Sequence, residues 1–215
     1  MKNQLTTLIA AAATLAIVVT AAGVAALLYW PKEQQLSKAQ QTGPCALDPQ
    51  TIAAVKQAST GYLKAFAPLD RPYSVKQFAF ADAAGTAKTL GDWTGRIVLL
   101  NLWATWCAPC RAEMPSLDDL QGELGGNGFE VVAISVDKSA PGKPRAFLDE
   151  IAIKKMRFYH DRQALTLNAL KREGLAIGLP ATLLVDGRGC AVGRINGPAE
   201  WNSADAHNLI KTVLK

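Results

Sequence analysis

Hydrophobic and polar positions divide this 215-residue chain into three regions. The first is a continuous apolar run, the second is a short polar stretch, and the third alternates short apolar runs with amphipathic segments. Strands are predicted where apolar residues are continuous or alternate, at 78–80, 86–90, 97–102, 129–136, 156–160, 182–186 and 191–195. Helices are predicted where apolar residues recur every three or four positions, from 49 to about 61 and at 108–124, 143–152, 163–172 and 201–214.

The order of these elements indicates the fold class. Strands that alternate with helices, followed by a terminal hairpin and a helix, predict an α/β domain with one mixed sheet flanked by helices. Hydrophobic residues make up 49% of the chain, so it can bury one good core. We expect this domain at 75–215, preceded by an N-terminal helical extension at 45–74.

The apolar run at 5–30 predicts a transmembrane anchor. No side chain from Asn3 to Pro31 is charged. A helix over 5–30 extends about 39 Å, which is enough to cross a hydrocarbon core of about 30 Å. The alternative is a cleaved signal peptide, whose apolar core runs only about 7–15 residues. We favour the uncleaved anchor, with residues 1–4 in the cytoplasm and 31–44 as a polar tether.

Charge and cysteine content limit the partners and the compartment. The formal net charge is +5 and no cluster of four lysines or arginines occurs, which argues against a nucleic-acid partner. The four cysteines form an even set, and two of them lie outside any motif, which is typical of an oxidising compartment. Together with the anchor, these features predict a single-pass protein of the inner (cytoplasmic) membrane whose domain lies in the periplasm.

The sequence Trp106-Cys107-Ala108-Pro109-Cys110 joins a predicted strand to a predicted helix. A Cys-x-x-Cys pair at a helix N-terminus is typical of dithiol–disulfide exchange, because unpaired N–H groups and partial positive charge favour the thiolate. The alternatives are half of a zinc site, for which the remaining Cys and His residues are too scattered, and an incidental pair of thiols. We predict a redox-active disulfide in which Cys107, half-exposed at the helix tip, is the nucleophile and Cys110, one turn inward, is the resolving thiol. We expect no metal and no cofactor.

Glu113 follows Cys110 by three residues and therefore lies about one helical turn away. One interpretation is a solvated carboxylate paired with Arg111, which is the commoner situation for a glutamate. The other is a partly buried proton acceptor that takes the proton of Cys110 while a mixed disulfide is resolved. The sequence leaves both interpretations open.

Cys45 and Cys190 lie outside the Cys-x-x-Cys motif, near the two ends of the domain. They are either two unrelated buried thiols or a structural disulfide between the N-terminal extension and the C-terminal hairpin. We favour the disulfide, because an exposed thiol would not persist in an oxidising compartment. His160 and His207 stand singly without neighbouring ligands, and we interpret both as structural.

The stretch LLNLWATWCAPCRAEMPSLDDL resembles the thioredoxin superfamily and, within it, the membrane-anchored TlpA/ResA/CcmG-type thiol–disulfide oxidoreductases. The resemblance covers about residues 75–214. It is closest to the TlpA-like members, through the isolated Cys45, the Gly-Arg-Gly-Cys190 turn, the Gly-Leu-Pro sequence at 178–180 and the segment at 197–201. It implies a thioredoxin-like sheet flanked by helices.

The resemblance also implies roles for particular residues. It implies a cis proline at Pro180, facing the cysteines, and it identifies Glu113 with the carboxylate of a CxxCxxE pattern. Ordinary thioredoxins carry an aspartate where this chain has Asn101, and CcmG-type members carry a glutamate where it has Ala181. The residues expected to contact a client are those next to Cys107 or to Pro180, namely Trp106, Ala108, Pro109 and Leu179.

The resemblance implies a periplasmic reductant of protein disulfides in copper-centre assembly of cytochrome oxidase. Its expected clients are a Sco-type copper chaperone and the oxidase subunit that carries the binuclear copper site. A membrane electron donor of the DsbD/CcdA type is expected to regenerate the dithiol, because oxidants dominate that compartment. The alternatives are a CcmG-like reductant of apocytochrome c, a copper(I)-binding metallochaperone and a docking module without redox activity.

Overall fold

The structure is a computed structural model that describes residues 45, 46 and 48–214. The predicted cytoplasmic end at 1–4, the anchor at 5–30 and the tether at 31–44 lie outside the described residues. Among the residues described, no helix has both the length and the apolar character needed to span a membrane.

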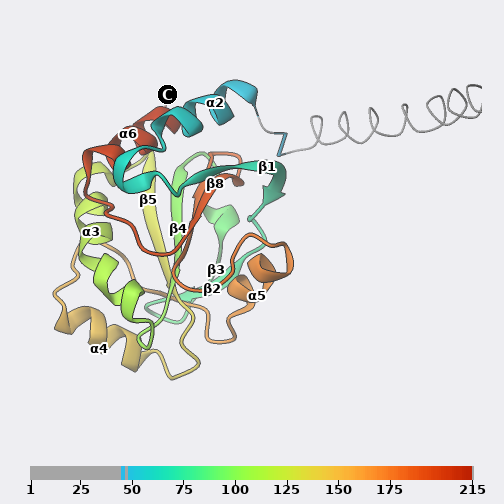
Figure 1. Cartoon of the computed structure of the whole chain (residues 1–215). Helices are drawn as coiled ribbons and strands as arrows, with labels where there is room; N and C mark the ends of the chain where they lie inside the picture. Colours follow the sequence, from blue (N-terminus) through green and yellow to red (C-terminus); the bar gives the residue numbers. More distant parts are fainter. Residues whose placement is uncertain (1–44, 47, 215) are drawn as a thin grey trace, which may run out of the picture. The chain divides into compact units, whose positions relative to one another are not determined.

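A mixed sheet with the strand order β1-β8-β7-β4-β5-β6-β2-β3 forms the centre of the described part (Figure 1). β4 pairs in parallel with β5 and antiparallel with β7, and β5 pairs in parallel with β6. The remaining neighbours are antiparallel. The strands are β1 (Ala67–Ser74), β2 (Ala79–Asp82), β3 (Ala87–Thr89), β4 (Ile97–Trp103), β5 (Phe129–Ser135), β6 (Tyr159–His160), β7 (Ala181–Val185) and β8 (Cys190–Asn196).

Helices lie on both sides of this sheet: in Figure 1, α3 is on one side of β4 and β5, and α5 is on the other. α2 packs against α6. The helices are α2 (Pro49–Ala58), η1 (Gly61–Leu63), η2 (Leu90–Trp93), α3 (Ala108–Leu124), α4 (Gly142–Glu150), α5 (Leu165–Arg172) and α6 (Ala204–Val213), of which η1 and η2 are 3-10 helices. The predicted α/β class, with a mixed sheet flanked by helices, is confirmed.

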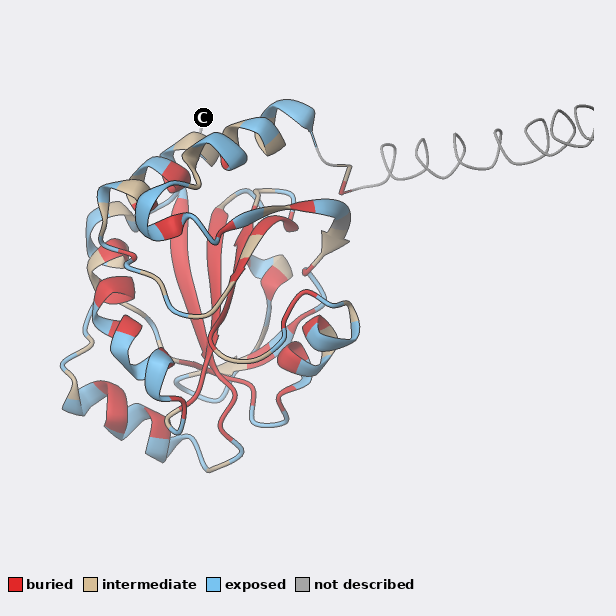
Figure 2. Cartoon of the chain, viewed as in Figure 1, coloured by how far each residue is buried: buried red, intermediate tan, exposed pale blue. Residues whose placement is uncertain are grey.

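The central strands position the site. Every residue of β4, β5 and β7 is buried, and Figure 2 shows these strands in red. Such continuous burial is expected for strands covered on both faces. Leu102 near the end of β4 pairs with Ala181 at the start of β7. The loop that follows β4 and the loop that precedes β7 therefore meet at one end of these central strands.

β1 is absent from the sequence-based prediction, which treats 45–74 as a helical extension. The segment contains α2 and η1, but its last residues form a strand that pairs with β8, with a register shift between Pro68 and Tyr73. β1 is an edge strand. Edge strands tolerate proline because one row of their N–H groups needs no partner in the sheet. The other predicted elements are present with shifted boundaries, the shortest being β6, which has two residues.

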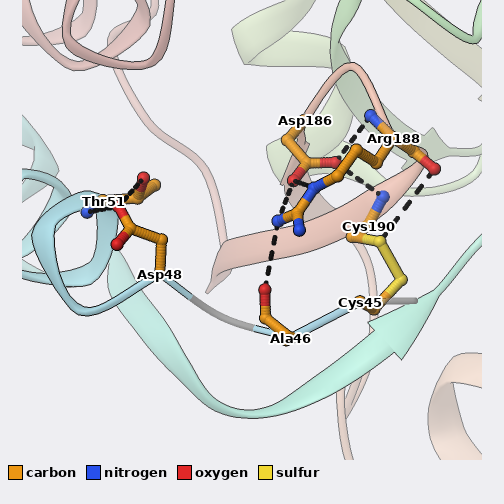
Figure 3. A network of polar contacts seen from close by, with 7 residues as sticks. All are labelled: Cys45, Ala46, Asp48, Thr51, Asp186, Arg188 and Cys190. Carbon is orange, nitrogen blue, oxygen red and sulfur yellow. Dashed lines mark hydrogen bonds and ion pairs between the residues drawn. A yellow bond between two sulfur atoms is a disulfide. The ribbon is translucent and has the colours of Figure 1, made fainter. Parts of the chain in front are cut away.

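A disulfide fastens the N-terminal segment to the first residue of β8, directly after the turn that joins β7 to β8 (Figure 3). Cys45 and Cys190 have Cα atoms 5.3 Å apart, and both residues are buried. The Arg188 guanidinium donates to Asp186 Oδ2 at 2.7 Å and to Ala46 O at 3.1 Å. The turn follows β7, whose opposite end lies beside the cysteine loop. The described chain thus begins at the end of the sheet away from the Cys-x-x-Cys pair.

Candidate active site

The Cys107–Cys110 pair lies where β4 is followed by α3. Cys107 is the N-cap of α3 and has an extended backbone, and Pro109 lies in the first turn. Cys107 Sγ accepts a hydrogen bond from the Cys110 backbone N at 3.3 Å. The two sulfurs form a disulfide, with 5.3 Å between the Cα atoms. The unpaired N–H groups and the positive end of the helix therefore stabilise a thiolate on Cys107 when the disulfide is reduced.

Cys107 is more buried than predicted. In this disulfide form it is 5% exposed and Cys110 is 0% exposed, so the expectation of a half-exposed nucleophile is wrong for the oxidised protein. The physical reason is that Sγ is bonded inward to Cys110. The adjacent Trp106, Ala108 and Pro109 are exposed instead. They make up the exposed surface next to Cys107.

Asp137 holds the loop that carries Cys107. Its carboxylate accepts hydrogen bonds from the backbone N and the hydroxyl of Thr105, at 2.9 and 2.7 Å, and from the Ser135 hydroxyl at 2.9 Å. His160 Nε2 lies 2.7 Å from the carbonyl oxygen of Asp137. Asp137 is 2% exposed, so solvent does not compete for these bonds. The backbone two residues before the nucleophile is thereby fixed.

Sequence reasoning missed Asp137, because its partner Thr105 is 32 positions away along the chain. One signal was available in the sequence. Asp137 directly follows the apolar strand predicted at 129–136, and the neighbouring strand at 97–102 ends at the cysteine loop. His160 supports this group from β6 and so has a structural position. His207 lies elsewhere, on α6, with its Nε2 atom 3.1 Å from Glu123 Oε2.

Glu113 is buried on α3 and accepts three hydrogen bonds. Its side chain is directed inward, and the residue is 3% exposed. Oε1 accepts from Asn101 Nδ2 at 2.8 Å, and Oε2 accepts from the Ala199 backbone N at 3.1 Å and from Trp201 Nε1 at 3.2 Å. Among the described residues Glu113 forms no ion pair with Arg111, which instead lies over the Phe147 ring. The structure therefore favours the buried carboxylate over the solvated one.

Burial raises the pKa of Glu113 from its ordinary value of 4.5 to about 7. The cause is loss of hydration, which disfavours the charged form. Hydrogen bonds from Asn101, Ala199 and Trp201 act in the opposite direction, because each stabilises the carboxylate. The balance leaves a group that exchanges a proton near neutral pH, which is the property a general base requires.

Asn101 can form a hydrogen bond with Glu113 whether the Glu113 carboxyl group is ionised or protonated. Its Nδ2 atom donates to Glu113 Oε1 and to Thr182 Oγ1, at 2.8 and 2.9 Å, whereas its buried Oδ1 atom has no hydrogen-bond partner among the described residues. A half-turn of the amide exchanges the two atoms. Oδ1 would then accept from a protonated Glu113 and from the Thr182 hydroxyl. An aspartate at this position would instead place a second carboxylate against Glu113.

Pro180 lies at the same end of the central strands. The Leu179–Pro180 peptide bond is cis. The next residue, Ala181, pairs with Leu102 near the end of β4, which places Pro180 beside the start of the cysteine loop. Leu179 is half-buried, whereas Ile177 in the same loop is 81% exposed. Ile177 is a client-contact candidate that the sequence did not single out.

The structure thus brings Cys107, Cys110, Glu113 and Pro180 to one end of the central strands and places the Cys45–Cys190 disulfide at the opposite end. This arrangement has the parts needed for disulfide exchange: a nucleophile at a helix N-terminus, a second thiol within bonding distance and a base one turn away. Among residues 45–214, with 47 omitted, no three His, Cys, Asp or Glu side chains are grouped so that they could hold a metal ion.

Comparisons with known proteins agree with this geometry. The family model described as Redoxin matches residues 71–210. The thiol-disulfide oxidoreductase ResA of Geobacillus kaustophilus is 31% identical over 134 residues, which cover 60% of this chain and 71% of that protein. The thiol:disulfide interchange protein HelX of Rhodobacter capsulatus is 36% identical over 118 residues, which cover 55% of this chain and 61% of HelX.

A solved structure shows the same fold. The crystal structure of a thiol:disulfide interchange protein of the thioredoxin family from Chlorobium tepidum matches with a TM-score of 0.57 and 25% sequence identity. The match covers 68% of this chain and 99% of that chain. The described part therefore has a thioredoxin-like fold, as the sequence resemblance implied.

Proposed function

This chain belongs to the Redoxin family and is a thiol–disulfide oxidoreductase, and on that premise we propose that it is a membrane-anchored periplasmic reductant of protein disulfides. Its thioredoxin-like domain supplies the dithiol. The proposed direction of electron flow rests on the resemblance to anchored periplasmic reductants, and the apolar run at 5–30 supports the anchor.

The reaction begins with the reduced protein. The Cys107 thiolate attacks one sulfur of a client disulfide, and the other client sulfur leaves as a thiolate and takes a proton from water. Cys110 then gives its proton to the Glu113 carboxylate and attacks Cys107 Sγ, which releases the second client sulfur as a thiolate. This thiolate also takes a proton from water, and Glu113 returns the proton of Cys110 to water. The client gains two electrons and two protons, and the Cys107–Cys110 disulfide forms. A membrane dithiol donor of the DsbD/CcdA type returns the two electrons.

One observation carries this mechanism: a buried carboxylate with a pKa of about 7 lies one helical turn from the resolving cysteine. A buried thiol is reluctant to ionise, because burial disfavours the thiolate. A base that is half ionised at neutral pH accepts the proton at the moment of attack. In the reverse direction the protonated Glu113 returns the proton to Cys110.

The described part of the chain begins far from the cysteine loop. Cys45 is held at the end of the sheet opposite to the cysteine loop. β7 has five residues between these ends, a rise of roughly 17 Å.

The proposed clients are proteins of copper-centre assembly in cytochrome oxidase: a Sco-type copper chaperone and the oxidase subunit with the binuclear copper site. The support for them is the resemblance to TlpA-like proteins. The chemistry is consistent, because cysteine ligands bind a metal only as thiolates and a disulfide between them prevents binding. A reductant of such disulfides would therefore act before metal insertion.

Trapping tests the proposal. In a Cys110→Ser variant the mixed disulfide on Cys107 cannot be resolved, so clients accumulate as covalent adducts that mass spectrometry identifies. We expect the Sco-type chaperone or the oxidase copper subunit among them, and no adducts in a matched variant that lacks Cys107 as well. Adducts with unrelated proteins alone would refute the copper-assembly role. Failure of the wild-type protein to reduce insulin disulfides would refute the reductant itself.

A further inference from the structure

Trp106, the residue before the nucleophile, stands between two hollows of the surface. It is 68% exposed. One hollow has a volume of about 490 Å³ and lies between the loop after β5, the start of α4, and α5. The other has a volume of about 330 Å³ and lies beside Arg111 and Phe147. Lys143 lines both. Both hollows therefore adjoin the residue next to the nucleophile.

The larger hollow combines an apolar floor with a basic rim. Val136 and Leu167 are buried residues that line it beside Trp106. Lys138, Lys143 and Lys171 line the same hollow and are exposed, and we call this set of six residues the lysine groove.

The positive charge of the lysine groove is not neutralised within the described part of the chain. None of its three lysines forms an ion pair with a described carboxylate. The Asp137 carboxylate also borders the hollow, but it is buried and bonded to Thr105 and Ser135. In the neighbouring hollow Arg111 adds a positive charge and Glu150 a negative one. The surface around Trp106 is therefore predominantly basic.

We propose that the lysine groove selects clients in which an acidic segment adjoins the disulfide. This inference rests on the proposed function, because it names the chemistry of the clients that the reductant takes. An extended acidic segment would place apolar side chains on Trp106, Val136 and Leu167 and its carboxylates against the three lysines. Complementary charge increases the rate of encounter and holds the partner in register, and salt weakens both effects. Basic segments are repelled from the same surface.

Two peptides with the same internal disulfide test the proposal, one flanked by three aspartates and the other by three lysines. The purified full-length chain in a non-ionic detergent reduces each peptide in turn, and the second-order rate constant is measured at low and at high salt. We expect the wild-type protein to reduce the acidic peptide about tenfold faster at low salt, within the range of electrostatic steering, and the preference to decline at high salt.

Reversing the charge of the groove identifies its location. In the triple variant Lys138→Glu, Lys143→Glu and Lys171→Glu, the preference inverts toward the basic peptide. In the corresponding glutamine variant the preference disappears without inverting. The matched control replaces three lysines on the α2 and α6 side of the domain, Lys56, Lys64 and Lys211, with glutamate, and it keeps the wild-type preference.

Equal rates for the two peptides with the wild-type protein would overturn the inference and leave the reductant intact. Loss of the preference in the control variant as well would also overturn it, because net charge and not the groove would then be responsible. If the wild-type protein reduced neither peptide, the proposed function would fail and the inference with it.

Discussion

Replacing Glu113 with glutamine tests whether the buried carboxylate acts on Cys110. The substitution keeps the size of the side chain and removes its ability to accept a proton. Cys107 attacks a client without this base, whereas Cys110 attacks the mixed disulfide only after losing its proton. We therefore expect Glu113→Gln to slow resolution of the mixed disulfide much more than its formation.

The raised pKa sets the expected magnitudes. With a pKa of about 7, Glu113 is ionised in about one tenth of molecules at pH 6 and about nine tenths at pH 8, so resolution should accelerate about tenfold over this range. Removal of a positioned base lowers a rate by about 10²-fold or more. The glutamine variant should resolve mixed disulfides slowly, and its rate should no longer show the inflection near pH 7.

The same pKa predicts how the free energy of unfolding depends on pH. Below pH 4.5 Glu113 is protonated in both the folded and the unfolded chain. Between pH 4.5 and 7 the unfolded chain releases the proton first, so the folded state loses about 3 kcal/mol relative to the unfolded state as the pH rises. Above pH 7 the difference is constant. The glutamine variant should lack this decline.

Rapid mixing with a disulfide peptide, quenched in acid, separates formation of the mixed disulfide from its resolution. Guanidinium denaturation of the oxidised protein between pH 4 and 8 measures the stability term. Equal slowing of the two steps by Glu113→Gln would refute the base assignment. A wild-type resolution rate without an inflection near pH 7 would show that the carboxylate is not poised as its burial indicates.

Two further predictions follow from buried contacts. Asp137→Ala should lower the free energy of unfolding by about 1–3 kcal/mol and slow the attack of Cys107 on clients, because the backbone N of Thr105 loses its partner. The control is Asp118→Ala, which removes an acceptor of loop N–H groups farther along α3 and should lower stability to a similar extent without slowing that attack. Equal slowing of the attack in both variants would contradict the role of Asp137. Replacing both Cys45 and Cys190 with serine should lower the free energy of unfolding by at most about 5 kcal/mol, the chain-entropy limit for so long a loop. The folded variant should reduce insulin at the wild-type rate. Loss of activity in the folded variant would argue against a purely structural disulfide.

Those features of the site that depend only on residues close together in the sequence could be predicted. The strand at 97–102 and the helix at 108–124 are indicated by local periodicity, so the placement of Cys107 and Cys110 at their junction required no tertiary information. Glu113 could be placed one turn from Cys110 for the same reason. Its burial could not be predicted, because the groups that enclose it come from β4 and from the segment before α6.

Local spacing thus specified which residues carry the chemistry: two thiols in the first turn of a helix and a carboxylate one turn later, since periodicity acts over a few residues. The tertiary structure decided how those residues behave. Chain segments 12 to 88 positions apart meet at the site, where Asp137 holds the cysteine loop and Trp201 and Asn101 surround Glu113. Their contacts remove water from the carboxylate, and loss of hydration is a property of the folded surroundings that no spacing rule contains.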